Sequence, residues 1–282
     1  MVSPAKIPQY PEFVGLSLIH QKRLQKEYNG LSKPTSHRLF SNLFITDTDN
    51  TTQISSLYGN IIVDRGLYKN HEGLMLLGEN MFMQTLAILF ENGLSFVELS
   101  PVNVLTSTID QDNSDYIYAM GKTDTLLGSE YEGVRRKVRK CVSLVTVKFA
   151  QINDDEKVWS MYEEWELQNS EKVDNGEKNS LEKALQFRAL IPISYVTFYV
   201  SNKIVGFCGV EDTSHQEVVV HFFKSLSDVA GLSEFMFHTI ATLYKRRCDV
   251  INFQQDLGIQ GLRRFKTSLR PVGIRPVYTL KS

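Results

Sequence analysis

The sequence predicts an α/β protein built from two similar halves. Segments with strand and helix patterns alternate twice along the 282 residues, once over roughly 35–125 and again over roughly 144–282. Hydrophobic residues make up 42% of the chain and charged residues 22%, the balance of a packed globular protein rather than a disordered one. This length fits one large domain or two moderate ones, and we expect domains at 1–143 and 144–282.

The first half reads as helices and short strands. Two strands meet at Gly59-Asn60, a pair that favours a turn, and Gly93 follows a helical apolar pattern as a C-terminal stop. The expected elements are helices over Leu18–Tyr28, Thr35–Ile45 and Asn80–Asn92, and strands over Gln53–Leu57, Asn60–Asp64, Gly73–Gly78, Leu94–Leu99 and Tyr116–Met120.

Three later helices are expected to begin with a capping box, in which a side-chain oxygen precedes a Glu by three residues. These are Ser129-x-x-Glu132, Asn153-x-x-Glu156 and Asn179-x-x-Glu182. Further helices are expected from Ser233 and over Ile259–Leu269, and strands over Leu144–Ile152, Ser194–Val200, Lys203–Val210, Glu217–Ser225, Asp249–Phe253 and Val277–Leu280.

Composition and motifs argue against several classes of function. A net charge of −1 is not that of a protein whose whole surface binds nucleic acid. The chain contains no H-E-x-x-H, G-x-S-x-G, Walker A or G-x-G-x-x-G segment, and its three cysteines are far apart. The N-terminus lacks a signal-peptide core, and no apolar run approaches the ~20 residues of a membrane span. We therefore expect a cytoplasmic protein, and group transfer without a metal stays open as its class of reaction.

The segment Val250–Pro271 carries the strongest functional signal. Nine basic residues and two acidic ones lie between Lys245 and Ser282, although the whole chain is nearly neutral. Asp256 precedes a predicted helix that carries Arg263 and Lys266, and the N–H groups at a helix start bind anions. The residues alone leave two interpretations open: a site for an anionic substrate, or an N-cap at Asp256 followed by a solvated basic face.

This segment resembles the signature N-x-x-x-D-L-G-x-x-G-L-R-x-x-K-x-x-x-x-P of the phosphatidylglycerol lysyltransferase C-terminal-like family (DUF2156). The matching residues are Asn252, Asp256-Leu257-Gly258, Gly261-Leu262-Arg263, Lys266 and Pro271. Weaker similarities extend the resemblance over roughly 36–282, at Phe40-Ser41-Asn42-Leu43-Phe44, at Tyr131 with Arg135-Arg136, and at Val220-His221 with Lys224. The chain departs from the pattern at Arg136, where Asn is usual, and at Phe223 and Gln254, where many members carry Glu.

The resemblance implies two tandem GNAT-like acyltransferase folds of the α/β (α+β) class, with mixed sheets flanked by helices, related to the FemABX aminoacyltransferases. It implies transfer of an aminoacyl group from aminoacyl-tRNA to an amine or hydroxyl of a small-molecule, peptide or lipid acceptor, with aminoacyl-tRNA as co-substrate and no metal or bound cofactor. The residues expected to be catalytic are Asp256, His221 and Lys266. Those expected to bind the substrates are Asn252, Gly258, Arg263, Lys224, Tyr131, Arg135 and Arg136.

Other interpretations stay open. His221 is either a general base or a core histidine with its hydrogen bonds satisfied. Arg136, Arg139 and Lys140 share one face of a predicted helix, which is either ordinary solvated surface or a ridge for tRNA phosphates. An acyl-CoA-dependent N-acyltransferase would use the same fold with a Gly-rich pyrophosphate turn, but the corresponding stretch, Leu226–Leu232, has one Gly and one acidic residue. A non-catalytic binding module is the third alternative.

Overall fold

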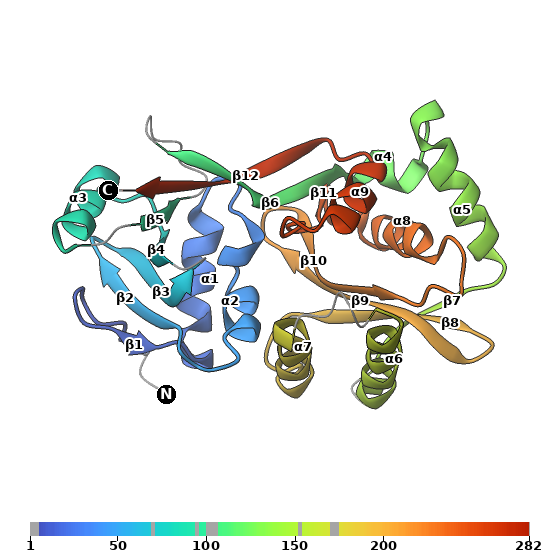
Figure 1. Cartoon of the computed structure of the whole chain (residues 1–282), viewed down its shortest axis with the longest axis horizontal. Coiled ribbons are helices and arrows are strands. Elements are labelled where there is room, and N and C mark those ends of the chain that lie inside the picture. The colour runs from blue at the N-terminus through green and yellow to red at the C-terminus, as the bar shows by residue number, and fades with distance from the viewer. Residues whose placement is uncertain are drawn as a thin grey trace. The chain divides into compact units, whose positions relative to one another are not determined.

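The computed structural model describes residues 6–68, 71–93, 96–99, 107–151, 154–169 and 175–281. The chain forms two compact units, Met1–Asp115 with Arg275–Ser282, and Tyr116–Ile274. The expected boundary at residue 143 falls inside the second unit, because the segments on both sides of it pack there. Strands β6 (Thr108–Ala119) and β12 (Gly273–Lys281) each run from one unit into the other (Figure 1).

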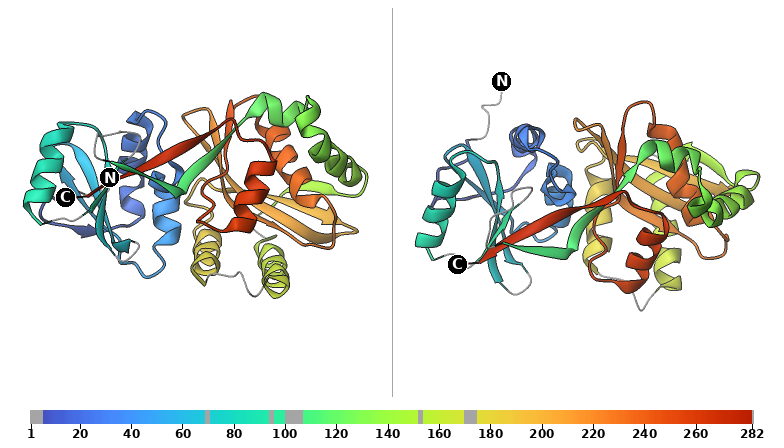
Figure 2. Two further views of the ribbon diagram at one scale, coloured as in Figure 1. Left: turned by 45° about the horizontal axis from the view of Figure 1, so that its top comes forward. Right: turned by 90° about the horizontal axis from the view of Figure 1, so that it is seen from above.

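The first unit is a mixed sheet with helices on both faces. Its strands follow the order β1-β2-β3-β4-β5-β12, with β4 and β5 parallel. Leu86 and Leu89 of the helix α3 pack on Ile62, Leu74 and Leu76 of the sheet, while α1 covers the other face (Figure 2). The elements are β1 (Val14–Gly15), η1 (Leu18–His20), α1 (Gln21–Gly30), η2 (Ser36–Arg38), α2 (Phe40–Thr46), β2 (Gln53–Leu57), β3 (Asn60–Tyr68), β4 (His71–Leu77), α3 (Phe82–Glu91) and β5 (Phe96–Leu99).

The second unit repeats this plan with the strand order β6-β11-β10-β9-β8-β7, in which β10 and β11 are parallel. Helices α6 and α7 lie on one face of the sheet and α8 on the other (Figure 1). The remaining elements are α4 (Met120–Thr125), η3 (Ser129–Tyr131), α5 (Glu132–Val142), β7 (Thr146–Phe149), α6 (Asp155–Gln168), α7 (Asn175–Gln186), β8 (Ser194–Val200), β9 (Lys203–Thr213), β10 (Glu217–Ser225), α8 (Leu232–Tyr244), β11 (Val250–Asn252) and α9 (Gln260–Ser268). The predicted α/β class, with mixed sheets flanked by helices, is confirmed.

The helices expected to begin with capping boxes are present, but two of the three capping boxes are not. Ser129 begins a 3₁₀ turn, and α5 starts at Glu132 without a side-chain cap, so the box predicted there is wrong. Asn179 lies inside α7, which begins four residues earlier, so that box is also wrong. The third, at Asn153, lies outside the described residues.

Helix α5 packs against the first turn of α8. Gly231 precedes α8 with φ +90°, and a Cβ atom there would lie 2.8 Å from the carbonyl oxygen of Lys137. The Lys137 ammonium bonds to Glu234 at 2.6 Å, and the Cys141 thiol lies 3.6 Å from the carbonyl of Ala230. The start of α8 is therefore covered by α5.

Gly231→Ala is expected to lower the free energy of unfolding by about 2 kcal/mol, because alanine is strained at this φ and its methyl group would clash with α5. Urea unfolding followed by tryptophan fluorescence measures this directly, since both tryptophans lie on α6 of the same unit. Gly133→Ala in α5 is the matched control: a Cβ there meets nothing within 4 Å, so it should stabilise. Equal stability of the two variants would contradict the packing described.

Candidate functional site

A layer of aromatic side chains holds α9 and the preceding loop on the sheet. Phe253, at the end of β11, lies at the centre, with its ring centroid 4.9 Å from that of Phe223 and 5.2 Å from that of Phe237. Phe265 of α9 closes the layer at 6.2 Å from Phe253. Phe223, one of the two positions where a carboxylate was expected from the resemblance, is therefore an apolar packing residue here.

The loop between β11 and α9 has an unusual backbone. Gln254 and Leu257 have φ of +52° and +54°, a region that residues other than glycine seldom occupy, and Gly258 follows at +74°. Two side chains stabilise this path: Asn252 Oδ1 accepts the N–H of Gln254 at 2.9 Å, and Asp256 Oδ1 accepts that of Gly258 at 2.9 Å. Strained backbone held in this way is characteristic of functional sites.

Asp256 is fully buried, and both of its oxygens are engaged. Arg263 forms a two-pronged pair with it, Nε to Oδ2 at 2.7 Å and Nη2 to Oδ1 at 2.8 Å, and the Tyr116 hydroxyl donates to Oδ2 at 2.6 Å. Burial acts to raise the pKa of this carboxyl, but the bonds from Arg263, Tyr116 and Gly258 outweigh it and lower the pKa to about 2. The N-cap of α9 is Ile259, so the interpretation of Asp256 as its N-cap is wrong.

Lys266 and Asn252 are buried and hold the loop by hydrogen bonds. The Lys266 side chain is buried, and its ammonium donates to the carbonyl oxygens of Phe253 and Gln255. Asn252 Nδ2 donates to Glu217 of β10 at 3.2 Å. Their contacts are those of groups that fix the loop in place, while the catalytic role expected of Lys266 stays a prediction.

His221 and Lys224 lie on β10 in separate environments. His221 sits at a β-bulge, where the register against β9 shifts, and its fully buried ring places Nε2 2.9 Å from Glu211. The Lys224 ammonium bonds to Glu177 at 2.7 Å and lies 3.7 Å from the ring centroid of Trp165. Burial lowers the pKa of Lys224, although the carboxylate of Glu177 opposes the shift.

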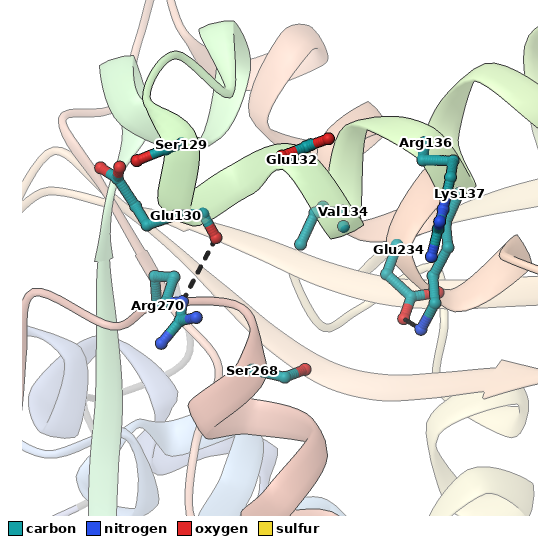
Figure 3. A pocket seen from close by; sticks show the side chains of 10 residues that line it. Ser129, Glu130, Glu132, Val134, Arg136, Lys137, Glu234, Ser268 and Arg270 are labelled. Carbon is teal, nitrogen blue, oxygen red and sulfur yellow. Dashed lines mark hydrogen bonds and ion pairs between the residues drawn. The ribbon is translucent and has the colours of Figure 1, made fainter.

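The expected donor-binding residues on α5 divide into structural and exposed ones. Tyr131 is buried, and the Arg135 guanidinium donates to the carbonyls of Leu126 and Gly128. Arg136 is exposed and lines a pocket of about 450 Å³, together with Lys137 and Arg270. Figure 3 shows Arg270 below the Glu130 carbonyl, which accepts its Nε–H at 3.4 Å, and Lys137 reaching Glu234.

The structure brings part of the predicted site together. The members of the C-terminal signature converge on one loop: Asn252, Asp256, Gly258, Arg263 and Lys266. His221 approaches that loop through Gln254, whose Nε2 lies 3.4 Å from His221 Nδ1. Lys224 pairs instead with Glu177 of α7, and Arg135 of α5 with the carbonyls of Leu126 and Gly128.

Sequence reasoning missed the partners supplied by distant strands. Tyr116, which bonds to Asp256, lies 140 residues before it, and Glu211 and Glu217 come from β9 and β10. Only the strand order could have brought them together. Of the helices in the described ranges, none has the length and apolar composition needed to cross a bilayer. Within the same ranges, no three His, Cys, Asp or Glu side chains cluster as a metal site requires.

The family model described as "Phosphatidylglycerol lysyltransferase, C-terminal" matches residues 77–281, which include α5 and the whole C-terminal signature. A search of curated proteins gives no significant match.

Three solved structures share the fold at low sequence identity. A conserved protein of unknown function from Bacteroides thetaiotaomicron has a TM-score of 0.83 at 20% identity, covering 95% of this chain and 98% of that one. The C-terminal domain (DUF2156) of a putative lysylphosphatidylglycerol synthetase from Agrobacterium fabrum has a TM-score of 0.64 at 12% identity, covering 93% and 92%. FemX has a TM-score of 0.62 at 8% identity, covering 96% and 97%. The expected relation to the FemABX fold is confirmed.

Proposed function

The chain belongs to the family of phosphatidylglycerol lysyltransferase C-terminal domains, and from this premise we propose that it transfers an aminoacyl group from aminoacyl-tRNA to an amine or hydroxyl acceptor. The family's name and the fold shared with FemX support an acceptor that is a lipid, a peptide or a related small molecule. Because charged tRNA is a cytoplasmic molecule, the proposal places the reaction in the cytoplasm.

The proposed chemistry needs positioning more than activation. An aminoacyl ester is already reactive, so the acceptor nitrogen or oxygen attacks its carbonyl carbon, and the bond from that carbon to the terminal ribose oxygen breaks. The proton lost by the acceptor ends on the ribose oxygen, and no electrons are gained or lost. N–H groups near the carbonyl would stabilise the oxyanion that develops.

The observation that carries the choice of donor is the exposed basic face of α5. Arg136, Arg139 and Lys140 are all exposed on it, while Val134, Val138 and Cys141 are buried on the other side. A row of cations at helical spacing suits the phosphates of an RNA backbone. The pocket beside Arg136 has a mixed lining, in which Lys137 and Arg270 lie with the carboxylates of Glu130, Glu132 and Glu234, so the choice of donor rests on the exposed helix face and not on the pocket.

The packing of α8 argues against acyl-CoA as the donor. A CoA-dependent enzyme of this fold would hold the pyrophosphate on N–H groups at the start of this helix. Here α5 packs on that turn, with the Lys137 carbonyl oxygen 2.8 Å from where a Cβ of Gly231 would lie, and the Glu234 carboxylate of the first turn is paired with the Lys137 ammonium. A pyrophosphate at this turn would have to displace a packed helix.

Within this proposal, buried and exposed members of the signature have different roles. Asp256, with a pKa of about 2 and both oxygens bonded, is a positioning residue that orients Arg263 and the loop. Lys266 holds two carbonyls of the same loop. Arg263, whose side chain is 36% exposed, is the signature cation that a substrate can reach.

The test is a mobility shift of total aminoacylated tRNA by the purified protein, with deacylated tRNA and acetyl-CoA as competitors. Retention of the charged tRNA, weakened by salt and resistant to acetyl-CoA, is the expected result. Sequencing the retained RNA would then identify the amino acid. Failure to retain charged tRNA, together with thermal stabilisation by acetyl-CoA, would replace this proposal with an ordinary acyltransferase.

Replacing Arg136, Arg139 and Lys140 together by glutamine is expected to flatten the salt dependence of tRNA binding. If each cation meets one phosphate, the slope of log K against log salt falls by about 2–3. Binding isotherms at several potassium chloride concentrations give this slope. The control is the triple variant at Lys22, Lys26 and Lys203, which are exposed on other elements and should leave it unchanged. An unaltered slope in the α5 variant would remove this helix from the tRNA site.

A further inference from the structure

A chain of buried hydrogen bonds ends at Gln254, in the loop of the C-terminal signature. The Glu211 and His221 side chains are 2% and 0% exposed, and Glu211 Oε2 lies 2.9 Å from His221 Nε2. The other ring nitrogen of His221, Nδ1, lies 3.4 Å from Gln254 Nε2. A fully buried imidazole, itself bonded to a buried carboxylate, thus contacts the amide of the half-buried Gln254.

This chain fixes which way the Gln254 amide faces. A carboxylate accepts hydrogen bonds, so in the neutral imidazole the bond to Glu211 places the ring proton on Nε2 and leaves Nδ1 as an acceptor. Nδ1 then takes a hydrogen bond from the Gln254 amide nitrogen, and the amide oxygen, Oε1, faces away from the ring. Oε1 accepts no hydrogen bond from the described residues and is not among the buried unpartnered atoms, so it reaches solvent.

The backbone at Gln254 is held as firmly as its side chain. Its φ of +52° is unfavourable for a residue with a Cβ, yet both of its backbone polar groups are bonded. The N–H donates to Asn252 Oδ1 at 2.9 Å, and the carbonyl accepts the N–H of Tyr116 at 3.0 Å. The Tyr116 hydroxyl also donates to Asp256, which ties the position of Gln254 to that of Asp256.

We propose that Gln254 is a specificity residue, whose Oε1 accepts a hydrogen bond from an uncharged N–H or O–H group of a substrate, and that Glu211 and His221 orient it. The inference rests on the proposed function. An amide oxygen is a neutral acceptor, whereas a carboxylate at the same place would favour an ammonium through a charge-assisted bond of roughly twice the strength. Glutamine here therefore selects uncharged groups over cations.

Gln254→Glu tests the proposal, with Gln260→Glu as the matched control. Gln260 is exposed at the start of α9 and undergoes the same chemical change six residues away. One arm applies total aminoacylated tRNA and sequences what each protein retains. The other fixes the tRNA pool and compares phosphatidylglycerol vesicles, which offer hydroxyls, with a lysine-containing peptide, which offers an ammonium.

Gln254→Glu is expected to raise the ratio of cationic to uncharged groups about tenfold, either among the retained aminoacyl groups or among the acceptors that react. A shift in the tRNA arm assigns the contact to the transferred aminoacyl group, and a shift in the acceptor arm assigns it to the acceptor. Unchanged ratios in both arms, with charged tRNA still retained, overturn this inference alone. If the wild-type protein retains no charged tRNA, the proposed function fails and the inference fails with it.

The orienting role of His221 has a separate readout. His221→Phe keeps the volume of the ring but removes Nδ1, and it should reduce the selectivity ratio while tRNA retention persists. Glu211→Gln, whose amide oxygen still accepts the Nε2–H, should keep the ratio, which makes the test informative if the phenylalanine variant folds poorly. Nitrogen-15 shifts of labelled histidine report the ring proton, expected on Nε2. A proton on Nδ1, or a ratio indifferent to His221→Phe, would contradict the orienting role.

Discussion

Replacing Glu98 by leucine is expected to lower the free energy of unfolding of the first unit by about 3–5 kcal/mol. Glu98, on β5, is 3% exposed, and the Arg38 side chain beside it is fully buried. Arg38 Nη2 lies 3.3 Å from Glu98 Oε1, and His37 contacts the same oxygen. Leucine would leave the Arg38 guanidinium buried without its carboxylate, which is the most costly way to break such a pair.

Amide hydrogen exchange by mass spectrometry measures this effect separately for peptides of β2–β4 and of β8–β10. Tryptophan fluorescence is unsuitable, because Trp159 and Trp165 both lie in the second unit. Adding Arg38→Met to Glu98→Leu should recover much of the loss, since replacing a whole buried pair is far cheaper than breaking it. Glu91→Leu, at an exposed position of α3, should stay within about 0.5 kcal/mol of wild type. Unchanged exchange in Glu98→Leu would show that the pair contributes little.

The contribution of Glu98 should also disappear in acid. Burial acts to raise its pKa, but His37, Arg38 and Arg65 lower it from 4.5 to about 2. The ionised group therefore stabilises the folded state fully above about pH 4.5, and this stabilisation is lost as the pH falls toward 2. The difference in exchange between wild type and Glu98→Leu should shrink over that interval.

Asp256→Asn is expected to reduce aminoacyl transfer about 100-fold, because loss of the carboxylate releases Arg263 and the loop from their fixed geometry. The free energy of unfolding should fall by about 2 kcal/mol, the value of hydrogen bonds to a charged group. Transfer of radiolabelled amino acid from total charged tRNA measures the first effect, and urea unfolding by tryptophan fluorescence the second.

Asp249→Asn makes the same chemical change at an exposed position seven residues earlier and should alter neither quantity. The stability gap between wild type and Asp256→Asn should close as the pH falls from about 4 toward 2, because the depressed pKa of Asp256 stabilises the fold only while the group is ionised. Full activity in Asp256→Asn would mean that the Arg263 pair is not needed to position the loop.

Local pattern was enough to predict the second half of the sheet. The apolar runs Ser194–Val200 and Glu217–Ser225 marked β8 and β10 at their observed bounds, since each is bordered by turn residues. Capping boxes failed because the same residue types also suit 3₁₀ turns and helix interiors. At Ser129 the chain forms a 3₁₀ turn before the helix begins, and Tyr131 at the end of that turn is buried.

The candidate site was predictable only where its members are close in sequence. Asn252, Asp256, Arg263 and Lys266 converge because a short strand, a loop and a helix follow one another directly. Their roles were not predictable, since a carboxylate or ammonium in a sequence gives no sign of its burial. Glu211 and Tyr116 reach the loop through the strand order β6-β11-β10-β9, which no local pattern specifies.

The division of the chain has a consequence for its synthesis. The first unit includes residues from both ends, because β12 pairs with β5 and contributes Leu280 to the apolar core under α3. The second unit is one continuous segment and can complete its sheet as soon as residue 274 leaves the ribosome. The unit translated first must therefore wait, with the β12 side of β5 uncovered, until β12 emerges, so it can complete its sheet only after the second unit has been synthesised.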